Sequence, residues 1–260
     1  MYFAVEIFPM CYDVSFKSSY DLITDYLPDI IIDRNMSLDF QDQSHVLAQA
    51  FKPYPVITFE EGKYYLKLFE WGVIADYMNT PDKVKKSRQW MCNARADKIL
   101  DKKTYWSRIR KNRCLMPVTG IYEHRGITGW KTKVPYHIKM KNEKMFFIPA
   151  VYNYSPLVNK ETGELLGTFS VVTRNANALM QKIHNANPDD PRMPLFVPFE
   201  MAKRWLDPRL TDDEIAEIMN YEMPSENLEA YPVFTIRSPK PRPDSKEKFE
   251  PYQWDELPGL

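Results

Sequence analysis

The middle of the chain is a run of β-strand patterns with no helical pattern between them. The predicted strands cover Cys114 to His124, Val134 to Met140, Met145 to Tyr152 and Thr168 to Thr173. Residues 56–74 predict a hairpin, because apolar and aromatic residues alternate on both sides of the polar turn at residues 60–63. A last strand is predicted over Val233 to Ile236. This order favours an α+β fold with a mostly antiparallel, barrel-like curled sheet flanked by helices.

Helical spacing and caps occur around this strand region. The predicted helices are Ser19 to Leu27, Ile99 to Asn112, Asn175 to Asn185, Pro198 to Leu206 and, after a cap at Thr211, Glu214 to Tyr221. Residues 238–260 are rich in proline and charge, so we expect a tail that is packed on the surface or flexible. The chain shows no repeat and no linker before about residue 237, which predicts one domain over residues 11–237.

Composition excludes several classes of protein. An apolar fraction of 44% with 14% aromatic residues indicates a folded globular chain. No apolar run approaches the ~18–20 residues that span a bilayer, and residues 2–9 lack the features of a signal peptide. We therefore expect a cytoplasmic protein, and we also expect a monomer.

The cysteines and histidines show no metal-binding or disulfide pattern. The cysteines stand at positions 11, 92 and 114, and the histidines at 45, 124, 137 and 184. Neither set has the spacing of a zinc site, and the odd cysteine count does not suggest a disulfide framework. We expect no metal and no cofactor, and we assign Cys92 and Cys114 to packing.

Charge is unevenly distributed although the formal net charge is zero. Residues 83–144 contain 18 lysines and arginines against 4 acidic residues. Such a segregated field can steer a polyanion to one face of a protein, although basic helices also often simply face water. The segment favours a nucleic-acid partner only in combination with the motifs within it.

Four short motifs occur in a fixed order. They are Asn93-Ala-Arg-Ala-Asp97, the stretch from Arg113 to Glu123, the stretch from Phe169 to Asn177, and Ile183-His184 followed by Arg192-Met193-Pro194. Together with Met10-Cys11, this set resembles the SOS-response-associated peptidase (SRAP) family, the abasic-site-processing proteins. The resemblance extends from Met10 to about Pro239. It implies a covalent cross-link between an N-terminal cysteine and an abasic site in single-stranded DNA, with catalytic positions at Cys11, Asn93, Glu123 and His184. It also implies a DNA-contacting arginine at Arg95, and we expect the protein to associate with the nucleoid when it is bound to DNA.

The chemistry of an N-terminal cysteine fits this implication. If Met10 is the start and is removed, Cys11 carries a free α-amine and a thiol on adjacent carbons. The amine can form a Schiff base with the open-chain aldehyde of an abasic site, and the thiol can then close a thiazolidine ring. The α-amine titrates near ~7.7–8.0 and the thiol near ~8.5, so reactive amine is present at neutral pH. Residues 1–10 are then a leader or a start assigned too early, and the family implies self-removal of such a leader.

The other candidate residues each have a role that suits their side chain. Glu123 follows an apolar strand and can transfer protons to the sugar oxygen and the carbinolamine. His184, near the end of a predicted helix, can relay protons, because histidine is the side-chain type best suited to proton transfer at pH 6–8. Asn93 can hold the amine or a sugar hydroxyl, because its amide both donates and accepts. Arg95 can bind a phosphate in bidentate fashion.

Further contacts with DNA are predicted for a second arginine and two tryptophans. Arg192 can pair with a phosphate as Arg95 does, and Trp71 and Trp90 can stack on bases. For each of these residues a purely structural role is the common alternative. Most tryptophans pack in a core, a strand-end glutamate usually faces water, and a histidine often caps a helix.

The chain departs from the family pattern at four places. The family's usual Met-Cys-Gly-Arg is Met10-Cys11-Tyr12-Asp13 here, so an early DNA-binding arginine is missing. His124 replaces the aromatic residue that often follows the glutamate, and residues 185–191 lengthen the spacing from His184 to Arg192. Nine residues precede Met10.

Two alternative functions remain open on the sequence. One is a conventional cysteine hydrolase or peptidase that uses Cys11 and His184 and needs no free α-amine. The other is a non-catalytic single-stranded DNA-binding module in which Cys11 is incidental. The intact mass of the purified protein separates them, because loss of residues 1–10 exposes the Cys11 amine.

Overall fold

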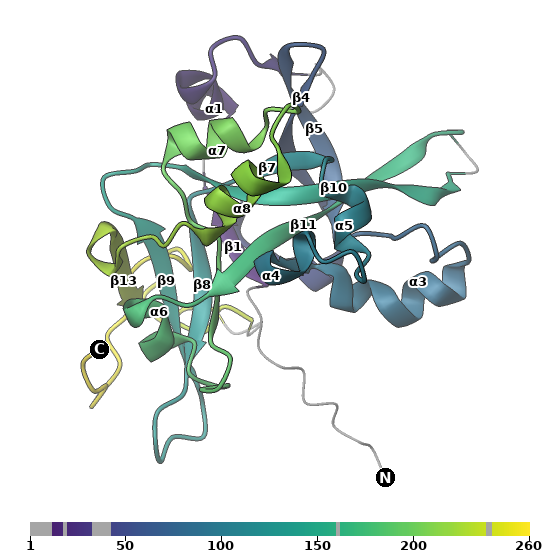
Figure 1. The fold of residues 1–260 in the computed structure, drawn as a ribbon. Coiled ribbons are helices and arrows are strands. Elements are labelled where there is room, and N and C mark those ends of the chain that lie inside the picture. The colour runs from purple at the N-terminus through teal and green to yellow at the C-terminus, as the bar shows by residue number, and fades with distance from the viewer. Residues whose placement is uncertain (1–11, 18–19, 33–42, 160–161, 238–240) are drawn as a thin grey trace.

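The computed structural model describes residues 12–17, 20–32, 43–159, 162–237 and 241–260. Within these residues, five strands close on themselves into a barrel (Figure 1). Around the barrel they are β5 (Lys63–Trp71), β4 (Pro53–Glu60), β7 (Arg113–Val118), β10 (Phe146–Val158) and β11 (Leu165–Asn175). Neighbours along this list pair antiparallel, and β11 closes the ring by pairing with β5 in parallel. The predicted barrel-like α+β fold is confirmed.

A second sheet lies beside the barrel and carries the β8–β9 hairpin (Figure 1). Its order is β13 (Leu228–Pro232), β9 (Val134–Met140), β8 (Gly120–Arg125), β1 (Asp13–Phe16) and β3 (Gln43–Leu47). Every pairing in it is antiparallel. Three short strands extend the barrel sheet, namely β2 (Ile31–Ile32), β6 (Asn93–Arg95) and β12 (Arg192–Pro194).

The hairpin and most helices form where the sequence predicts them. The hairpin is β4–β5, and Glu61 and Gly62 make its turn with φ of 51° and 80°. The helices that match are α1 (Tyr20–Tyr26), α6 (Ala178–Ile183), α7 (Phe199–Trp205) and α8 (Asp212–Asn220). A capping box between Thr211 and Glu214 begins α8. A further helix, α3 (Pro81–Ser87), begins at the Thr80 cap.

Three predicted elements differ from the structure. The single helix predicted over residues 99–112 is two short helices, α4 (Ala96–Ile99) and α5 (Trp106–Ile109). The Thr104 hydroxyl donates to the carbonyls of Lys98 and Asp101, at 2.6 and 3.0 Å, and stabilises a turn between them. The strand predicted over residues 114–124 divides at Thr119 into β7 and β8, which belong to different sheets. The last strand is β13, which ends before residue 233.

The C-terminal segment is packed against the second sheet. Arg242 is buried and donates to the backbone carbonyls of Glu247, Glu250 and Pro251 at 2.6–2.8 Å. Arg125 on β8 donates to the carbonyls of Pro258 and Gly259 at 2.7 and 2.8 Å. Residues 241–260 therefore follow the surface next to β8 and β9 rather than extending away from it.

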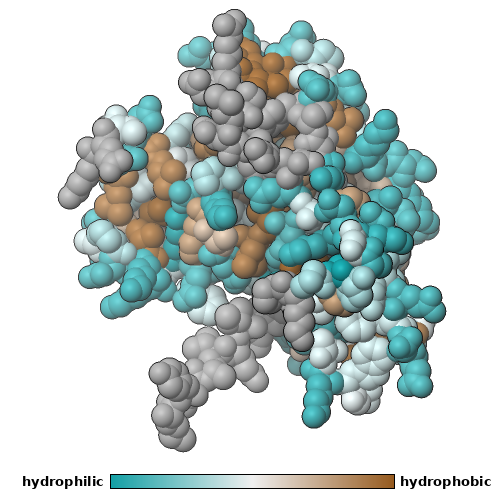
Figure 2. Space-filling view, turned by 180° about the vertical axis from the view of Figure 1, so that it is seen from behind, coloured by the Kyte–Doolittle hydropathy of each residue, from teal (hydrophilic) through white to brown (hydrophobic). Residues whose placement is uncertain are grey.

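The core is aromatic where the barrel closes. Trp71 and Phe169 stack with their ring centroids 5.9 Å apart, and Tyr54 packs against both. On the face seen in Figure 2, hydrophobic side chains appear in separate patches among hydrophilic ones. Among the helices of the described residues, none combines the length and apolar character needed to cross a bilayer.

Candidate active site

Asn93 and Arg95 lie on β6, which is held beside the barrel by parallel pairing with β11. Asn93 is 4% exposed, whereas Arg95 is partly exposed. Neither polar atom of the Asn93 amide has a hydrogen-bond partner among the described residues. A buried polar group without a partner costs about 1–3 kcal/mol. The Asn93 amide is thus in a position to bind a group that the described part of the protein does not supply.

Glu123 is buried on β8, with an exposed fraction of 3%. The residue before it, Tyr122, pairs with Asp13 on β1, so the antiparallel register brings Tyr12 opposite Glu123. The first residue of β8, Gly120, must be a glycine for a steric reason. A Cβ atom on Gly120 would lie 2.1 Å from Nε2 of His137 on β9. In the Gly-Ile-Tyr-Glu motif, Gly120 therefore allows His137 to pack closely against β8, and Glu123 supplies a buried carboxylate three residues later.

His184 is the C-cap of α6 and is 1% exposed. Its Nδ1 lies 2.5 Å from the backbone oxygen of Arg192 and 3.1 Å from its backbone nitrogen. In the second of these contacts the Arg192 backbone N–H donates to Nδ1. The two contacts fix the orientation of the buried imidazole ring against β12.

The site lies where the two sheets meet, on a continuous set of packed elements. β6 and β12 both pair with β11, and His184 is joined to β12 through Arg192. The next residue, Asn185, exchanges two hydrogen bonds of 2.8 and 2.9 Å with the backbone of Gly126 at the end of β8. These contacts connect the elements of Asn93, Glu123 and His184. Cys11 lies outside the described residues and directly precedes Tyr12.

The two predicted DNA-binding arginines differ in environment. Arg95 has a side chain that is 40% exposed, and it pairs with Asp97 at 3.0 Å and with Asp190 at 2.7 Å. Arg192 is 4% exposed and donates to Asn175 Oδ1 at 2.8 Å and to the Thr173 carbonyl at 3.0 Å. Arg95 is therefore accessible to a phosphate that competes with Asp97 and Asp190, whereas Arg192 is used within the protein to fix β12 against β11.

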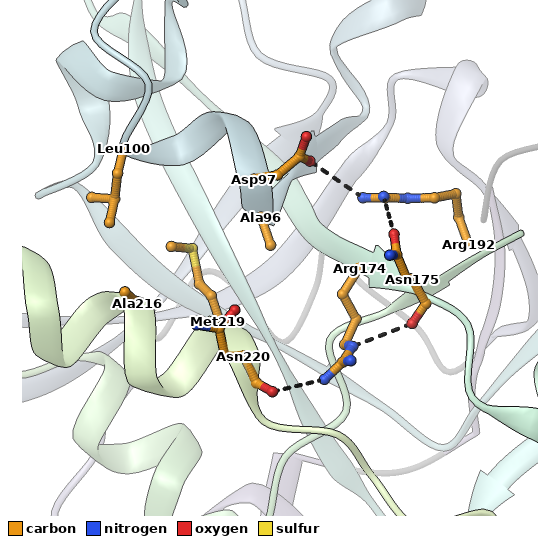
Figure 3. Close-up of a pocket in the computed structure, with 9 residues that line it drawn as sticks. All are labelled: Ala96, Asp97, Leu100, Arg174, Asn175, Arg192, Ala216, Met219 and Asn220. Carbon is orange, nitrogen blue, oxygen red and sulfur yellow. Dashed lines mark hydrogen bonds and ion pairs between the residues drawn. The ribbon is translucent and has the colours of Figure 1, made fainter. Parts of the chain in front are cut away.

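A pocket of about 280 Å³ lies beside Arg192 (Figure 3). Asp97, Asn175 and Arg174 give it a polar side, and Met219 and Leu100 give it an apolar side. Arg174 also donates to the backbone of Asn220, which connects α8 to this wall. The pocket continues the surface of the site toward α4 and α8.

The tryptophan predictions require a correction. Trp71 is 2% exposed, and its indole N–H donates to the Cys92 carbonyl at 2.8 Å. It therefore belongs to the core and cannot present a face to a base. Trp90 is 46% exposed and keeps its predicted role as a stacking candidate. Cys92 and Cys114 are buried free cysteines, and burial raises the pKa of the Cys92 thiol to about 12.

A charged cluster at the start of β1 was not predicted from the sequence. Asp13 is buried, with an exposed fraction of 3%. Its Oδ1 lies 2.7 Å from His45 Nε2 and accepts a hydrogen bond from Arg237 Nε at 3.1 Å. Its Oδ2 accepts a second hydrogen bond from Arg237, from Nη2 at 2.5 Å. Burial acts to raise the pKa of Asp13, but these hydrogen bonds and the positive charges hold it below its ordinary value. Nearby, burial lowers the pKa of His124 to about 4, so its ring is neutral at physiological pH. The one sequence signal was the acidic residue at position 13, where the family pattern has arginine.

No group of three or more histidine, cysteine or acidic side chains is arranged to hold a metal ion among the described residues.

Comparison with known proteins supports one family. A family model described as SOS response associated peptidase (SRAP) matches residues 10–236. The abasic site processing protein YoqW of Bacillus subtilis (strain 168) is 30% identical over 171 residues, which are 65% of this chain and 70% of that protein. The abasic site processing protein YMR114C of Saccharomyces cerevisiae is 23% identical over 173 residues, 65% of this chain and 43% of that one.

Two crystal structures have a similar fold. A protein from Bacteroides thetaiotaomicron superimposes with a TM-score of 0.76 at 29% identity, covering 93% of this chain and 97% of that chain. A protein from Bordetella bronchiseptica gives a TM-score of 0.70 at 16% identity, covering 86% and 100%, and so shows the fold alone.

Proposed function

Because the chain belongs to the SOS response associated peptidase family, we propose that it captures abasic sites in single-stranded DNA as a covalent thiazolidine through the amine and thiol of Cys11. The active form begins at Cys11, after a start at Met10 or after self-removal of the leader. Peptidase activity is confined in this proposal to that self-processing. The names of the curated relatives support abasic-site processing as the general function.

The observation that carries the proposal is the buried amide of Asn93, which has no hydrogen-bond partner among the described residues. Its strand, β6, is connected through β11 to the elements that carry Glu123 and His184. An amide that both donates and accepts suits a carbinolamine, which presents an N–H and a hydroxyl together. A buried carboxylate and a buried imidazole, those of Glu123 and His184, provide two groups for proton transfer. The Arg95 guanidinium adds a bidentate phosphate contact at the edge of the site.

The chemistry needs proton transfers but no external oxidant or reductant. Protonation of the sugar ring oxygen by Glu123 opens the hemiacetal and releases the aldehyde. The Cys11 amine adds to the aldehyde carbon, and the resulting carbinolamine loses water to give an imine. The thiol sulfur then adds to the imine carbon while the thiol proton passes to the nitrogen, which closes the ring. His184 accepts the proton that the C1 hydroxyl loses as the ring opens, and it returns a proton when the carbinolamine hydroxyl leaves as water.

Cross-linking to an oligonucleotide with one abasic site tests the proposal. Protein that begins at Cys11 is expected to give a band that survives denaturing electrophoresis. The same protein retaining residues 1–10 has an amide at Cys11 and should give no band. Equal cross-linking by both forms would overturn the proposal and favour a hydrolase-type internal thiol.

Substitution of Cys11 separates the amine from the thiol. Cys11→Ala still has an α-amine after loss of Met10, so it can form an imine but cannot close the ring. We expect an adduct that is seen only after borohydride reduction. A stable adduct formed by Cys11→Ala without reduction would place the chemistry at another residue. If no form of the protein gave an adduct although each still bound DNA, the result would favour a non-catalytic DNA-binding module.

A further inference from the structure

We propose that Arg237 is a DNA-phosphate-binding residue of this site, held in place by the buried carboxylate of Asp13. The inference deepens the proposed function and rests on it for the identity of the ligand. Arg237 comes from the segment that follows β13, far from Asp13 in the sequence.

The geometry of the ion pair leaves one side of the guanidinium available. Nε and Nη2 of Arg237 donate to the two oxygens of Asp13. These two bonds occupy one edge of the planar guanidinium group. Nη1 has no hydrogen-bond partner within the described part of the chain. Arginine presents five N–H donors in a planar fork, so the opposite edge can bind a phosphate while the first edge stays on Asp13.

The relative exposure of the two side chains in this ion pair favours binding of an anion from solvent. The Asp13 side chain is 3% exposed, whereas that of Arg237 is 49% exposed. An approaching phosphate therefore meets the positive member first, and the negative member lies behind it. The Asp13 contact also reduces the entropy that the Arg237 side chain would lose on binding, because the side chain is already held in one geometry.

The pair lies next to the candidate catalytic carboxylate. Asp13 begins β1 and pairs with Tyr122, the neighbour of Glu123. Burial acts to lower the pKa of Arg237, but the hydrogen bond and charge of Asp13, with the charge of Glu123, outweigh burial and raise it. Asp13 also follows Cys11 by two residues. The charge of Glu123 acts on Arg237, so the guanidinium and the candidate catalytic carboxylate belong to the same region of the molecule.

Binding to an intact single-stranded oligonucleotide, without an abasic site, tests the inference independently of the cross-link. Arg237→Gln is expected to weaken binding about tenfold at low salt, as for one charge-assisted hydrogen bond. The slope of log affinity against log salt should fall in magnitude by about 0.7, the value for one phosphate contact on a single strand. Wild-type affinity and slope in Arg237→Gln, with an unchanged melting temperature, would overturn the inference.

Two further variants distinguish a DNA contact from a structural ion pair. Arg209→Gln is the matched control, because Arg209 makes the same two-bond contact with Asp207, at 2.9 and 2.8 Å, on the turn between α7 and α8. It should bind DNA as the wild type does. Asp13→Asn keeps the Arg237 charge but releases its side chain, so it should weaken binding less than Arg237→Gln does and should keep the wild-type salt slope. An equal loss of affinity and of salt slope in Asp13→Asn and Arg237→Gln would show a purely structural role.

If Arg237→Gln fails to fold, Arg237→Lys decides the question. Lysine keeps the charge but lacks the fork that reaches Asp13 and a phosphate together. We expect the wild-type salt slope with a severalfold weaker affinity, and wild-type affinity would contradict the inference. Absence of cross-linking by the wild-type protein that begins at Cys11 would overturn the proposed function while leaving these binding results unaffected.

Discussion

At the scale of single residues, the acidic neighbours of Arg95 determine how readily it can bind DNA. Asp190 belongs to the stretch 185–191 that lengthens the spacing between His184 and Arg192, and its carboxylate contacts the Arg95 guanidinium at 2.7 Å. A phosphate oxygen would occupy a similar position. DNA binding through Arg95 must therefore displace Asp190 or share the guanidinium with it.

Replacement of Asp190 should consequently strengthen DNA binding. Asp190→Asn removes the competing charge, and because exposed ion pairs contribute little, we expect an increase in affinity of about twofold to fivefold. Asp189→Asn is the control, since Asp189 makes no ion pair within the described residues. Fluorescence anisotropy with a labelled single strand measures both variants. Weaker binding in Asp190→Asn would mean that Asp190 orients Arg95 rather than competes for it.

The Asp13 cluster should give a specific pH dependence of stability. The pKa of Asp13 is lowered in the folded protein, so its ionised form stabilises the fold above its ordinary pKa of ~3.8. This contribution is lost as the pH falls through the lowered value. The stability difference between wild type and Asp13→Asn should therefore be constant from pH 5 to pH 7, and should shrink below about pH 4. Urea unfolding over this range measures it; a difference that grows toward acid pH would contradict the assigned direction.

At the scale of elements, the β8–β9 hairpin depends on the absence of a side chain at Gly120. His137 packs over it, with Nε2 at 2.9 Å from Ser15 Oγ and Nδ1 at 3.0 Å from Tyr231 Oη. Burial lowers the pKa of His137 to about 3, so the ring packs as a neutral group. An added methyl group would have to move this ring or the strand that carries Glu123.

Gly120→Ala should therefore destabilise the protein and slow cross-linking together. Overpacking a filled core typically costs about 1–3 kcal/mol. Gly259→Ala is the control, because a Cβ there meets no atom within 4 Å. Thermal unfolding and single-turnover cross-linking of both variants provide the two readouts. A melting temperature for Gly120→Ala equal to that of the wild type would show that His137 can move away at no cost.

Elements set by local sequence were predictable, and those set by distant contacts were not. The β4–β5 hairpin follows from alternation around a glycine turn, and α8 follows from the Thr211 cap. The division of the 114–124 segment at Thr119 depends on β1, because the Thr119 N–H donates to the Ser15 carbonyl at 2.9 Å. Periodicity within one segment carries no information about a partner a hundred residues away.

At the scale of the whole molecule, the same limit applies to the candidate site. Asn93, Glu123 and His184 were identifiable because each lies in a short motif, and the fold connects their elements. Trp71 resembled a stacking residue in sequence but is the centre of the barrel core. Arg237 could not be identified from the sequence, because no motif surrounds it. Its place beside Asp13 on β1 arises only in the folded chain, where residues 224 positions apart come together.

The central claim is that Cys11 reacts with an abasic site through both its amine and its thiol. The intact mass of the adduct formed with a single-stranded oligonucleotide, without reductant, tests this claim most directly. The account predicts the mass of the protein beginning at Cys11 plus that of the abasic oligonucleotide minus one water, with the Cys11 thiol resistant to alkylation. An adduct that retains residues 1–10, or one whose Cys11 thiol remains free to alkylating reagents, would contradict it.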